Sequence, residues 1–316
     1  MTGSLVGKVA VVTGAARGLG EAIAIAYGRE GAKVVVVDRT TEPFSRQGIV
    51  SEGTIHRTAE IIRSVGGEAL PVKVDLRDEA EIEDCARIVA DTYGGADIVV
   101  NNAAIAYTAR VKDMPLARWV QSYAVNSRGT FLMCKHFVPM MLPKGRGSII
   151  NLMTGRWAFP GFGAYSSSKA AVDHFTLSLS EELRHFNIAV NCVAPSQGFR
   201  TPAGSYWQGG EAGQGGDPSQ METQEPPEHA AKAFVWLARQ DASTFTGNLV
   251  WSRPLIARYD LCDEWCCRGT IIGDRWRVEP TGRFPAGVPS NLGTVPPIDE
   301  AAAAEESTEA STENAY

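Results

Sequence analysis

Short apolar runs alternate with longer amphipathic segments over the N-terminal two thirds of the chain. The runs predict strands at Val9–Val12, Lys33–Asp38, Ala69–Asp75, Asp97–Asn101, Ser148–Leu152 and Ile188–Ala194, with a last strand at Thr246–Val250. The segments between them predict helices at Leu19–Glu30, Thr54–Val65, Glu79–Tyr93, Leu116–Met141, Ala164–Phe186 and Glu228–Arg239. Apolar strands separated by helices are typical of a parallel sheet covered on both faces, and right-handed crossovers make it doubly wound. The pattern predicts one α/β domain over residues 1–255.

Three segments interrupt this rhythm. Residues 39–53 are longer than the usual connection after a second strand. Residues 203–227 are rich in glycine and proline, with Tyr206 and Trp207 as the bulky side chains, so we expect a flexible lid over an active site. A surface insertion without function is the alternative. Residues 256–298 follow no regular pattern, and we expect them to wrap around the domain as an irregular extension.

Charge is concentrated at the C-terminus. The chain has 36 acidic and 30 basic residues, a net charge of −6, and the six carboxylates of residues 299–316, which contain no Lys or Arg, account for that difference. We expect residues 299–316 to be a disordered acidic tail. The neutral remainder predicts no nucleic-acid binding. No apolar run approaches the roughly 18 residues of a membrane span, and no signal or peroxisomal motif is recognisable, so we expect a cytoplasmic protein.

The six cysteines predict neither a disulfide framework nor a metal site. Cys85, Cys134 and Cys192 stand singly within predicted helices and a strand, where buried free thiols are expected. Cys262, Cys266 and Cys267 form C-x3-C-C without a nearby His, whereas zinc sites usually pair two C-x2-C units.

A glycine-rich turn, Thr13–Gly20, joins the first strand to the first helix. Its glycines, Gly14, Gly18 and Gly20, allow a tight turn that brings backbone N–H groups and a helix N-terminus close to a pyrophosphate. Asp38 ends the second strand about 20 residues later, where an acid accepts the adenosine ribose hydroxyls. This carboxylate would repel a 2′-phosphate, so we favour NAD, while Arg17 and Arg39 keep NADP open.

The T-G-x3-G-x-G spacing resembles the short-chain dehydrogenase/reductase family. Asp75-Leu76 resembles that family's adenine-contacting pair, and Asn101–Ala104 resembles its N-N-A-G motif with Ala104 in place of Gly. The resemblance covers about residues 5–250, and residues 53–78 look closest to hydroxysteroid dehydrogenase-like members. It implies a Rossmann-type sheet of about seven strands in the order 3-2-1-4-5-6-7. The cofactor contacts that it implies, together with the glycine turn, are Gly14, Arg17, Gly18, Leu19, Gly20, Asp38, Arg39, Asp75, Leu76, Asn102, Ala103 and Ala104.

Tyr165 and Lys169 are spaced i, i+4 near the start of a predicted helix, so they lie on one face, one turn apart. A tyrosine with a pKa of about 10 is too weak a base at neutral pH, but a nearby ammonium and a positive nicotinamide ring would stabilise its phenolate. The resemblance implies that Tyr165 is the general acid/base and that Lys169 binds the nicotinamide ribose. An exposed helix face carrying both residues is the alternative.

Two further positions complete the set of catalytic residues. Asn126 matches the family's helix asparagine, which is thought to hold a water in a proton relay. The family serine after the fifth strand is absent, and Thr154 stands there instead, eleven residues before Tyr165 rather than thirteen. Its hydroxyl can still donate to a carbonyl, so we expect Thr154 to take the serine's role. A strand-end cap beside an incomplete catalytic set is the alternative.

The segment after the sixth strand, Pro195–Thr201, resembles the family's P-G-x3-T motif, which contacts the nicotinamide carboxamide. Ser196 replaces the glycine, and Thr201 lies one residue late. We include Pro195 and Thr201 among the cofactor contacts.

Aromatic residues bias the expected substrate pocket towards an apolar ligand. Ala103–Tyr107, Gly155–Phe162 and the predicted lid would line it. The resemblance implies an NAD-dependent oxidoreductase that interconverts a secondary alcohol and its ketone, and the aromatic residues favour a hydrophobic substrate. It also implies a homodimer or homotetramer, formed through the long helices at 116–141 and 164–186. Two alternatives stay open: a non-redox enzyme of the same fold (an epimerase, lyase or dehydratase), and a nucleotide-binding protein without catalysis.

Overall fold

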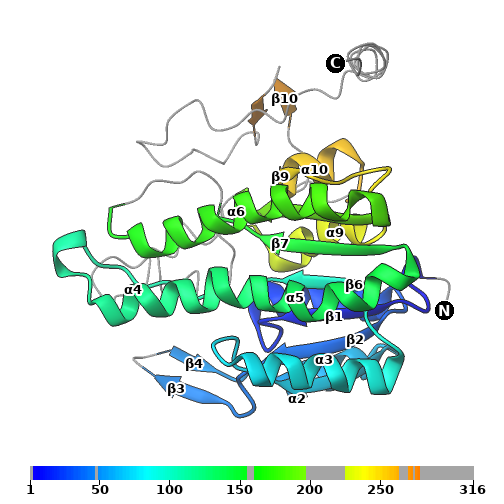
Figure 1. Cartoon of the computed structure of the whole chain (residues 1–316), viewed down its shortest axis with the longest axis horizontal. Coiled ribbons are helices and arrows are strands. Elements are labelled where there is room, and N and C mark those ends of the chain that lie inside the picture. The colour runs from blue at the N-terminus through cyan, green and yellow to red at the C-terminus, as the bar shows by residue number, and fades with distance from the viewer. Residues whose placement is uncertain are drawn as a thin grey trace, which may run out of the picture.

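A seven-stranded parallel sheet forms the centre of the molecule (Figure 1). The computed structural model describes residues 3–46, 49–154, 160–196 and 225–262, with the backbone alone at 44–46, 49–51, 270–272 and 275–277. The strands in spatial order are β5 (Glu68–Lys73), β2 (Lys33–Asp38), β1 (Val9–Thr13), β6 (Ile98–Asn101), β7 (Gly147–Leu152), β8 (Ile188–Ala194) and β9 (Leu249–Trp251). Numbered along the chain within this sheet, the order is 3-2-1-4-5-6-7, so the predicted Rossmann-type topology is confirmed.

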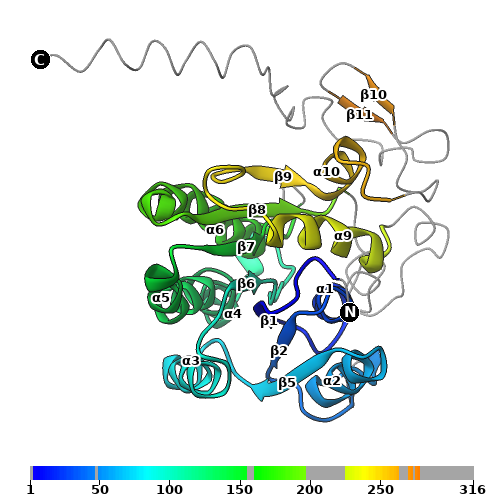
Figure 2. The same ribbon diagram turned by 90° about the vertical axis from the view of Figure 1, so that its right-hand side faces the viewer.

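Helices cover both faces of the sheet, as Figure 2 shows end-on. One face carries α1 (Gly18–Arg29), α2 (Ile55–Ser64) and α9 (Pro227–Ala238), and the other carries α3 (Glu79–Tyr93), α4 (Leu116–Tyr123), α5 (Gly129–Met141) and α6 (Gly163–Leu183). A short helix, α10 (Ser252–Arg258), follows β9 and spans the predicted domain boundary at residue 255.

The apolar strands supply a core on each side of the sheet. In β1, Ala10 and Val12 join the cluster under α1 and α9, whereas Val9 and Val11 join the cluster under α3 and α5. This division follows from the two-residue period of a strand, whose successive side chains point to opposite faces. A run such as Val34–Val37 is therefore buried throughout, which explains why these strands show no polar alternation.

The long predicted helix at 116–141 is interrupted. A π-helical turn, Ala124–Arg128, separates α4 from α5. Such a turn carries one extra residue within a helix and occurs frequently at functional sites. Helical patterns lie on both sides of this turn, which is why the sequence predicted a single helix.

The insertion after β2 is a small antiparallel hairpin of β3 (Phe44–Arg46) and β4 (Ile49–Ser51). The predicted helix then begins one residue later than expected, because the Thr54 side chain accepts a hydrogen bond from the Arg57 N–H at 3.0 Å and caps α2. Within the predicted extension at 256–298, β10 (Thr270–Ile272) and β11 (Arg275–Arg277) pair antiparallel. The acidic tail, 299–316, lies outside the described residues.

Cys85, Cys134 and Cys192 are buried free thiols, as predicted, and Cys262 is buried, with its Sγ 2.9 Å from Lys232 Nζ. Cys266 and Cys267 lie outside the described residues. In the part of the chain that the structure describes, no cluster of three or more His, Cys, Asp or Glu side chains is placed to hold a metal ion. None of the helices described there is long and apolar enough to cross a membrane.

A buried carboxylate joins three elements at the amino end of the sheet. Asp97 is 5% exposed, and its Oδ2 accepts the Val9 N–H at 2.9 Å, at the start of β1. Its Oδ1 accepts a hydrogen bond from Lys144 Nζ at 3.2 Å. Asp97 therefore ties β1, the segment before β6 and the turn before β7 together.

We predict that Asp97→Ala lowers the free energy of unfolding by about 3 kcal/mol. The substitution leaves the buried Val9 N–H and the Lys144 ammonium without their hydrogen-bond acceptor. Urea denaturation measures the change. Asp84→Ala is the control, since the exposed ion pair of Asp84 with Arg87 contributes less than about 0.5 kcal/mol. Equal stability of the two variants would contradict this role of Asp97.

Candidate nucleotide-binding and catalytic site

The glycine turn packs directly against the end of β6. Gly14 has a φ of 68°, and a Cβ there would lie 2.8 Å from Ala103 Cα. The Thr13 hydroxyl accepts hydrogen bonds from the Asn102 and Ala103 N–H groups, each at 3.1 Å, and Asn102 Nδ2 donates to the Thr13 carbonyl at 2.9 Å. These bonds fix the two strand ends and leave room for the backbone alone at Gly14.

A cavity of about 290 Å³ opens at the carboxyl ends of the strands, beside this turn. Every cofactor contact predicted between Gly14 and Ala104 lines it: Gly14, Arg17, Gly18, Leu19, Gly20, Asp38, Arg39, Asp75, Leu76, Asn102, Ala103 and Ala104. Thr13, Val37, Val74, Ile105, Tyr107, Gln121, Val125 and Leu152 complete the lining. The carboxyl-end rule for ligand sites in open α/β sheets would have found Val37 and Val74. Gln121 carries no sequence signal, because its place depends on how α4 packs.

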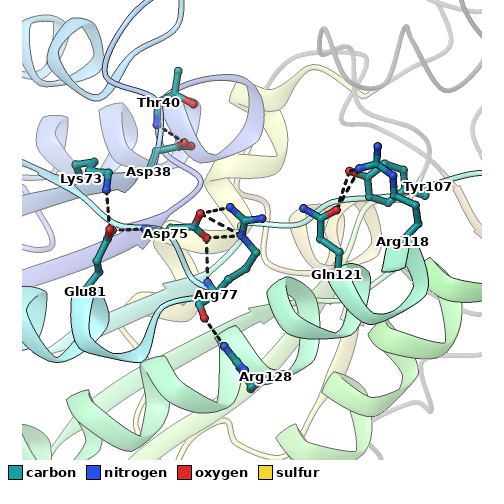
Figure 3. Close-up of polar contacts among 10 residues, drawn as sticks. All are labelled: Asp38, Thr40, Lys73, Asp75, Arg77, Glu81, Tyr107, Arg118, Gln121 and Arg128. Carbon is teal, nitrogen blue, oxygen red and sulfur yellow. Dashed lines mark hydrogen bonds and ion pairs between the residues drawn. The ribbon is translucent and has the colours of Figure 1, made fainter. Parts of the chain in front are cut away.

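Asp38 stands at the end of β2 with its carboxylate oriented by backbone donors. Its Oδ1 accepts the Thr40 N–H at 3.0 Å (Figure 3), and its Oδ2 lies 3.5 Å from the Ala16 N–H. Arg17, across the glycine turn, donates to the Thr40 hydroxyl at 3.4 Å. Burial lowers the pKa of Arg17, and the charge of Asp38 partly offsets this effect. An acid and an arginine thus share this end of the cavity.

Asp75 is locked in an ion pair. Arg77 donates to its carboxylate from Nε at 2.9 Å and from Nη2, and these hydrogen bonds hold the pKa of Asp75 at about 2 (Figure 3). The Asp75 N–H in turn donates to Glu81, which also pairs with Lys73 at 2.6 Å. Arg128 donates to the Arg77 carbonyl from the π-helical turn. The carboxylate of Asp75 is therefore ionised and held in place over a wide range of pH.

A second polar group lines the cavity opposite Asp75. The Tyr107 hydroxyl accepts a hydrogen bond from Arg118 at 2.6 Å and donates to Gln121 Oε1 at 3.2 Å (Figure 3). The Arg118 guanidinium also lies 4.4 Å from the centre of the Tyr107 ring. These contacts fix Tyr107, which was predicted to line the substrate pocket, against α4.

Lys169 is almost completely buried on α6, with 1% of its surface exposed. Its Nζ donates to the Leu152 carbonyl at 2.6 Å, at the end of β7. Burial lowers the pKa of Lys169 to about 8, while the charge of Asp173, one turn further along α6, acts in the opposite direction. Leu152 also lines the cavity. The buried ammonium therefore lies directly behind the nucleotide-sized cavity.

Tyr165 and Thr154 meet beside this lysine. Burial raises the pKa of the Tyr165 hydroxyl, and a hydrogen bond with the Thr154 side chain opposes that rise. The Phe162 ring packs edge-on against the Tyr165 ring at a centroid distance of 6.3 Å. The structure thus brings Tyr165, Lys169 and Thr154 to the end of β7 and the start of α6.

Asn126 is fully buried in the π-helical turn. Its Oδ1 accepts the Ile105 N–H and its Nδ2 donates to the Ile105 carbonyl, both at 2.9 Å. Nδ2 also donates to the Ser168 hydroxyl at 2.9 Å, and that hydroxyl donates to the Tyr165 carbonyl at 2.7 Å. Asn126 therefore connects the segment after β6 to the helical turn that carries Tyr165.

The segment predicted to contact a nicotinamide is described only in part. Pro195 and Ser196 follow β8, whereas Thr201 lies outside the described residues. The pocket residues Arg156, Trp157, Phe159, Tyr206 and Trp207 also lie outside them, as does the predicted lid from 203 to 224.

Comparisons with known proteins agree with this geometry. The sequence profile of the family described as short chain dehydrogenase matches residues 8–208. Hydroxysteroid dehydrogenase-like protein 2 of Danio rerio is 32% identical over 267 residues, which is 83% of this chain and 61% of that protein. The chain thus spans about three fifths of the length of this relative.

Two solved structures share the fold. Carveol dehydrogenase from Mycobacterium avium, in complex with NAD, superposes with a TM-score of 0.70 at 25% identity, over 79% of this chain and 97% of that one. A metagenomic short-chain oxidoreductase in complex with NADP superposes with a TM-score of 0.64 at 30% identity, over 78% of this chain and 98% of that one.

We predict that Gly14→Ala weakens the binding of ADP-ribose at least about tenfold, because the added Cβ would meet Ala103 and Asn102 at 2.8 Å. Isothermal calorimetry measures the affinity. Gly7→Ala is a matched control: Gly7 also has a positive φ, 77°, but no atom lies within 4 Å of the added Cβ. Both variants carry the strain of a left-handed residue, so equal affinities would show that the Gly14 contact is unimportant for binding.

Proposed function

The chain belongs to the short-chain dehydrogenase family, and we propose that it is an NAD-dependent oxidoreductase that interconverts a secondary alcohol and its ketone. One observation carries the proposal. The Leu152 carbonyl receives the buried Lys169 ammonium, while Leu152 itself lines the cavity beside the glycine turn. The acid/base residues and the nucleotide-sized cavity therefore share one strand end.

The site fits a dinucleotide at its adenosine end. A side chain at Gly14 or Gly20 would fill the space over the turn, since a Cβ at Gly20 would lie 2.1 Å from the Gly14 carbonyl oxygen. The backbone at the start of α1 offers N–H donors to a pyrophosphate. The carboxylates of Asp38 and Asp75 can accept hydrogen bonds from ribose hydroxyls and from the adenine amino group. When bound, the nicotinamide supplies a hydride acceptor or donor.

Tyr165 transfers the proton in the proposed reaction. In alcohol oxidation its phenolate takes the proton of the substrate hydroxyl, and in ketone reduction its hydroxyl returns it. Burial alone works against the phenolate by raising the pKa of Tyr165. The Lys169 ammonium favours the phenolate, because an opposite charge nearby stabilises the ionised form. Its own pKa of about 8 keeps Lys169 largely protonated at neutral pH.

Lys169 also retains binding capacity. An ammonium has three donors, and one of them is used by the Leu152 carbonyl in the described structure. The remaining N–H groups are available to ribose hydroxyls. Asn126 acts indirectly: its hydrogen bonds hold Ile105 and the helical turn that carries Tyr165 in place.

Thr154 takes the place of the family serine in this proposal. The Thr154 side chain is close enough to Tyr165 to oppose the rise of the tyrosine pKa, which supports this role despite the shorter spacing. A substrate oxygen between them would accept one hydrogen bond from each side chain. This arrangement favours the redox reaction over a nucleotide-binding protein without catalysis.

NAD is the proposed cofactor because of Asp38. Backbone N–H groups hold both carboxylate oxygens of Asp38, so the carboxylate is fixed where a 2′-phosphate would have to lie. The two solved structures contain NAD in one case and NADP in the other, so they do not favour either cofactor. The choice of NAD therefore rests on Asp38. Arg17 and Arg39 remain the groups through which an NADP preference would arise.

The proposed substrate is a hydrophobic alcohol or ketone, and the proposed assembly is a homodimer or homotetramer. Leu116 and Val120 on α4 and Phe131 on α5 are 76%, 55% and 48% exposed. Apolar side chains gathered on one pair of helices favour a subunit contact at this face.

We expect Tyr165→Phe to abolish turnover, with a loss of at least about 100-fold, because it removes the proton-transferring hydroxyl. NADH formation at 340 nm, with NAD⁺ and a panel of secondary alcohols that includes hydroxysteroids and terpenols, measures the rate. Tyr93→Phe, which deletes a hydroxyl on the far end of α3, retains activity. Turnover that survives Tyr165→Phe would refute the proposed base.

Replacing Asp38 tests the choice of cofactor. In Asp38→Ser the carboxylate charge is gone while a short hydrogen-bonding group remains, so the KM for NADP⁺ falls about tenfold or more relative to that for NAD⁺. Initial rates with both cofactors give the ratio. A wild-type chain that already prefers NADP⁺ would contradict the proposed role of Asp38.

A further inference from the structure

A buried carboxyl group connects three segments behind the end of β8. Glu225, just before α9, is 1% exposed. Its Oε2 accepts a hydrogen bond from the Ser252 hydroxyl at 2.5 Å and lies 3.4 Å from the Ser196 N–H. Its Oε1 is buried and has no hydrogen-bond partner among the residues that the structure describes. Figure 2 shows the elements involved, with β8, β9, α9 and α10 gathered at one end of the sheet.

Ser196 is held from several sides by this group. Its N–H donates to Ser252 Oγ at 3.1 Å, and its own hydroxyl accepts the Arg253 N–H at 3.0 Å. The Ser196 and Ser252 hydroxyls lie 3.4 Å apart. The glycine that related sequences carry at the position of Ser196 has no hydroxyl, so the bond from Arg253 depends on this chain's own residue.

The cluster of Ser196, Glu225, Ser252 and Arg253 lowers the stability of the fold, which suggests that it has a role in function. A carboxyl group buried with an unsatisfied oxygen destabilises the fold, because it loses hydration without full replacement. The cluster is also located where it can act: Ser196 continues β8, which pairs with β7 at Leu152, the partner of Lys169.

We propose that Glu225 is a positioning residue for the nicotinamide end of the site, acting through Ser252 and Ser196 to hold the Pro195–Ser196 segment ready for the carboxamide. The inference rests on the proposed function, since it assumes that this segment contacts a nicotinamide. Glu225 itself touches the backbone of the segment rather than the ligand. A prearranged segment loses less conformational freedom on binding and therefore binds more tightly.

The proposed role depends on pH. Burial raises the pKa of Glu225 to about 7, and the charge of Arg253, on α10, opposes this rise. Among the described residues, the other groups that contact the carboxyl are the Ser252 hydroxyl and the Ser196 amide, neither of which titrates in this range. A carboxylate accepts hydrogen bonds more strongly than a carboxylic acid, so the segment is held more firmly as pH rises through 7.

Comparing NADH with ADP-ribose isolates the nicotinamide end, because ADP-ribose lacks the nicotinamide ring. Calorimetric affinities of both ligands are measured for the full chain and its variants between pH 6 and pH 8. In Glu225→Ala, NADH binding weakens about tenfold or more, whereas ADP-ribose binding changes less than about twofold. Glu225→Gln keeps the shape without the charge, so at pH 8 it binds NADH as the wild type does at pH 6, and its affinity ratio is independent of pH.

Two milder variants guard against misfolding. Ser252→Ala removes the donor to Glu225, and Ser196→Gly removes the acceptor of the Arg253 N–H; both weaken NADH binding selectively. Ser148→Ala is the matched control, because Ser148 is equally buried and donates to the Leu237 carbonyl of α9, away from this cluster. It leaves the ratio of the two affinities unchanged.

The outcomes separate the two proposals. A wild-type chain that binds neither ligand would refute the proposed function itself. A wild-type chain that binds both, with the same NADH to ADP-ribose ratio in Ser252→Ala, Ser196→Gly and the Glu225 variants, would refute the positioning role and leave the proposed function standing.

Discussion

The contact between the Lys169 ammonium and the Leu152 carbonyl is the constraint on which the site depends. A charge with 1% exposure loses most of its hydration, and the 2.6 Å hydrogen bond at the end of β7 replaces part of it. The contact exists only if α6 lies against β7 at one register. The same register places Tyr165, one helical turn earlier, beside Thr154. One packing arrangement therefore sets both the fold at this point and the placement of the residues that carry the proposed acid/base chemistry.

Buried polar groups around this contact connect it to neighbouring segments of the fold. Asn126 ties the segment after β6 to α6 through Ser168, and the π-helical turn is what brings its side chain to that position. On the other side, Glu225 holds the end of β8 through Ser252. Neither Asn126 nor Glu225 lines the described cavity. Asn126 and Glu225 hold backbone segments in the positions that the proposed reaction requires. Residues that contact a ligand are placed precisely only when neighbouring residues hold them in this way.

Sequence periodicity predicted the sheet well because every central strand is buried on both faces, as at Val34–Val37. Motif spacing predicted the residues that line the cavity, since they all follow strand ends. The π-helical turn was missed because helical patterns lie on both sides of it, and one extra residue within a helix leaves no separate sequence signal. The cluster around Glu225 was missed because its members are separated by up to 57 positions, and only the pairing of β8 with β9 brings them together. Short-range patterns contain no signal for such contacts.

The most direct test of the account is the pKa of the Tyr165 hydroxyl with NAD⁺ bound. Tyrosinate absorbance, taken as the difference between the wild type and Tyr165→Phe, follows its ionisation as the pH is raised. The same difference is then measured in the Lys169→Met background. The account predicts that the pKa of Tyr165 is at least about one unit lower with the lysine than without it, because the buried ammonium stabilises the phenolate. Equal values in the two backgrounds would contradict the central role of Lys169.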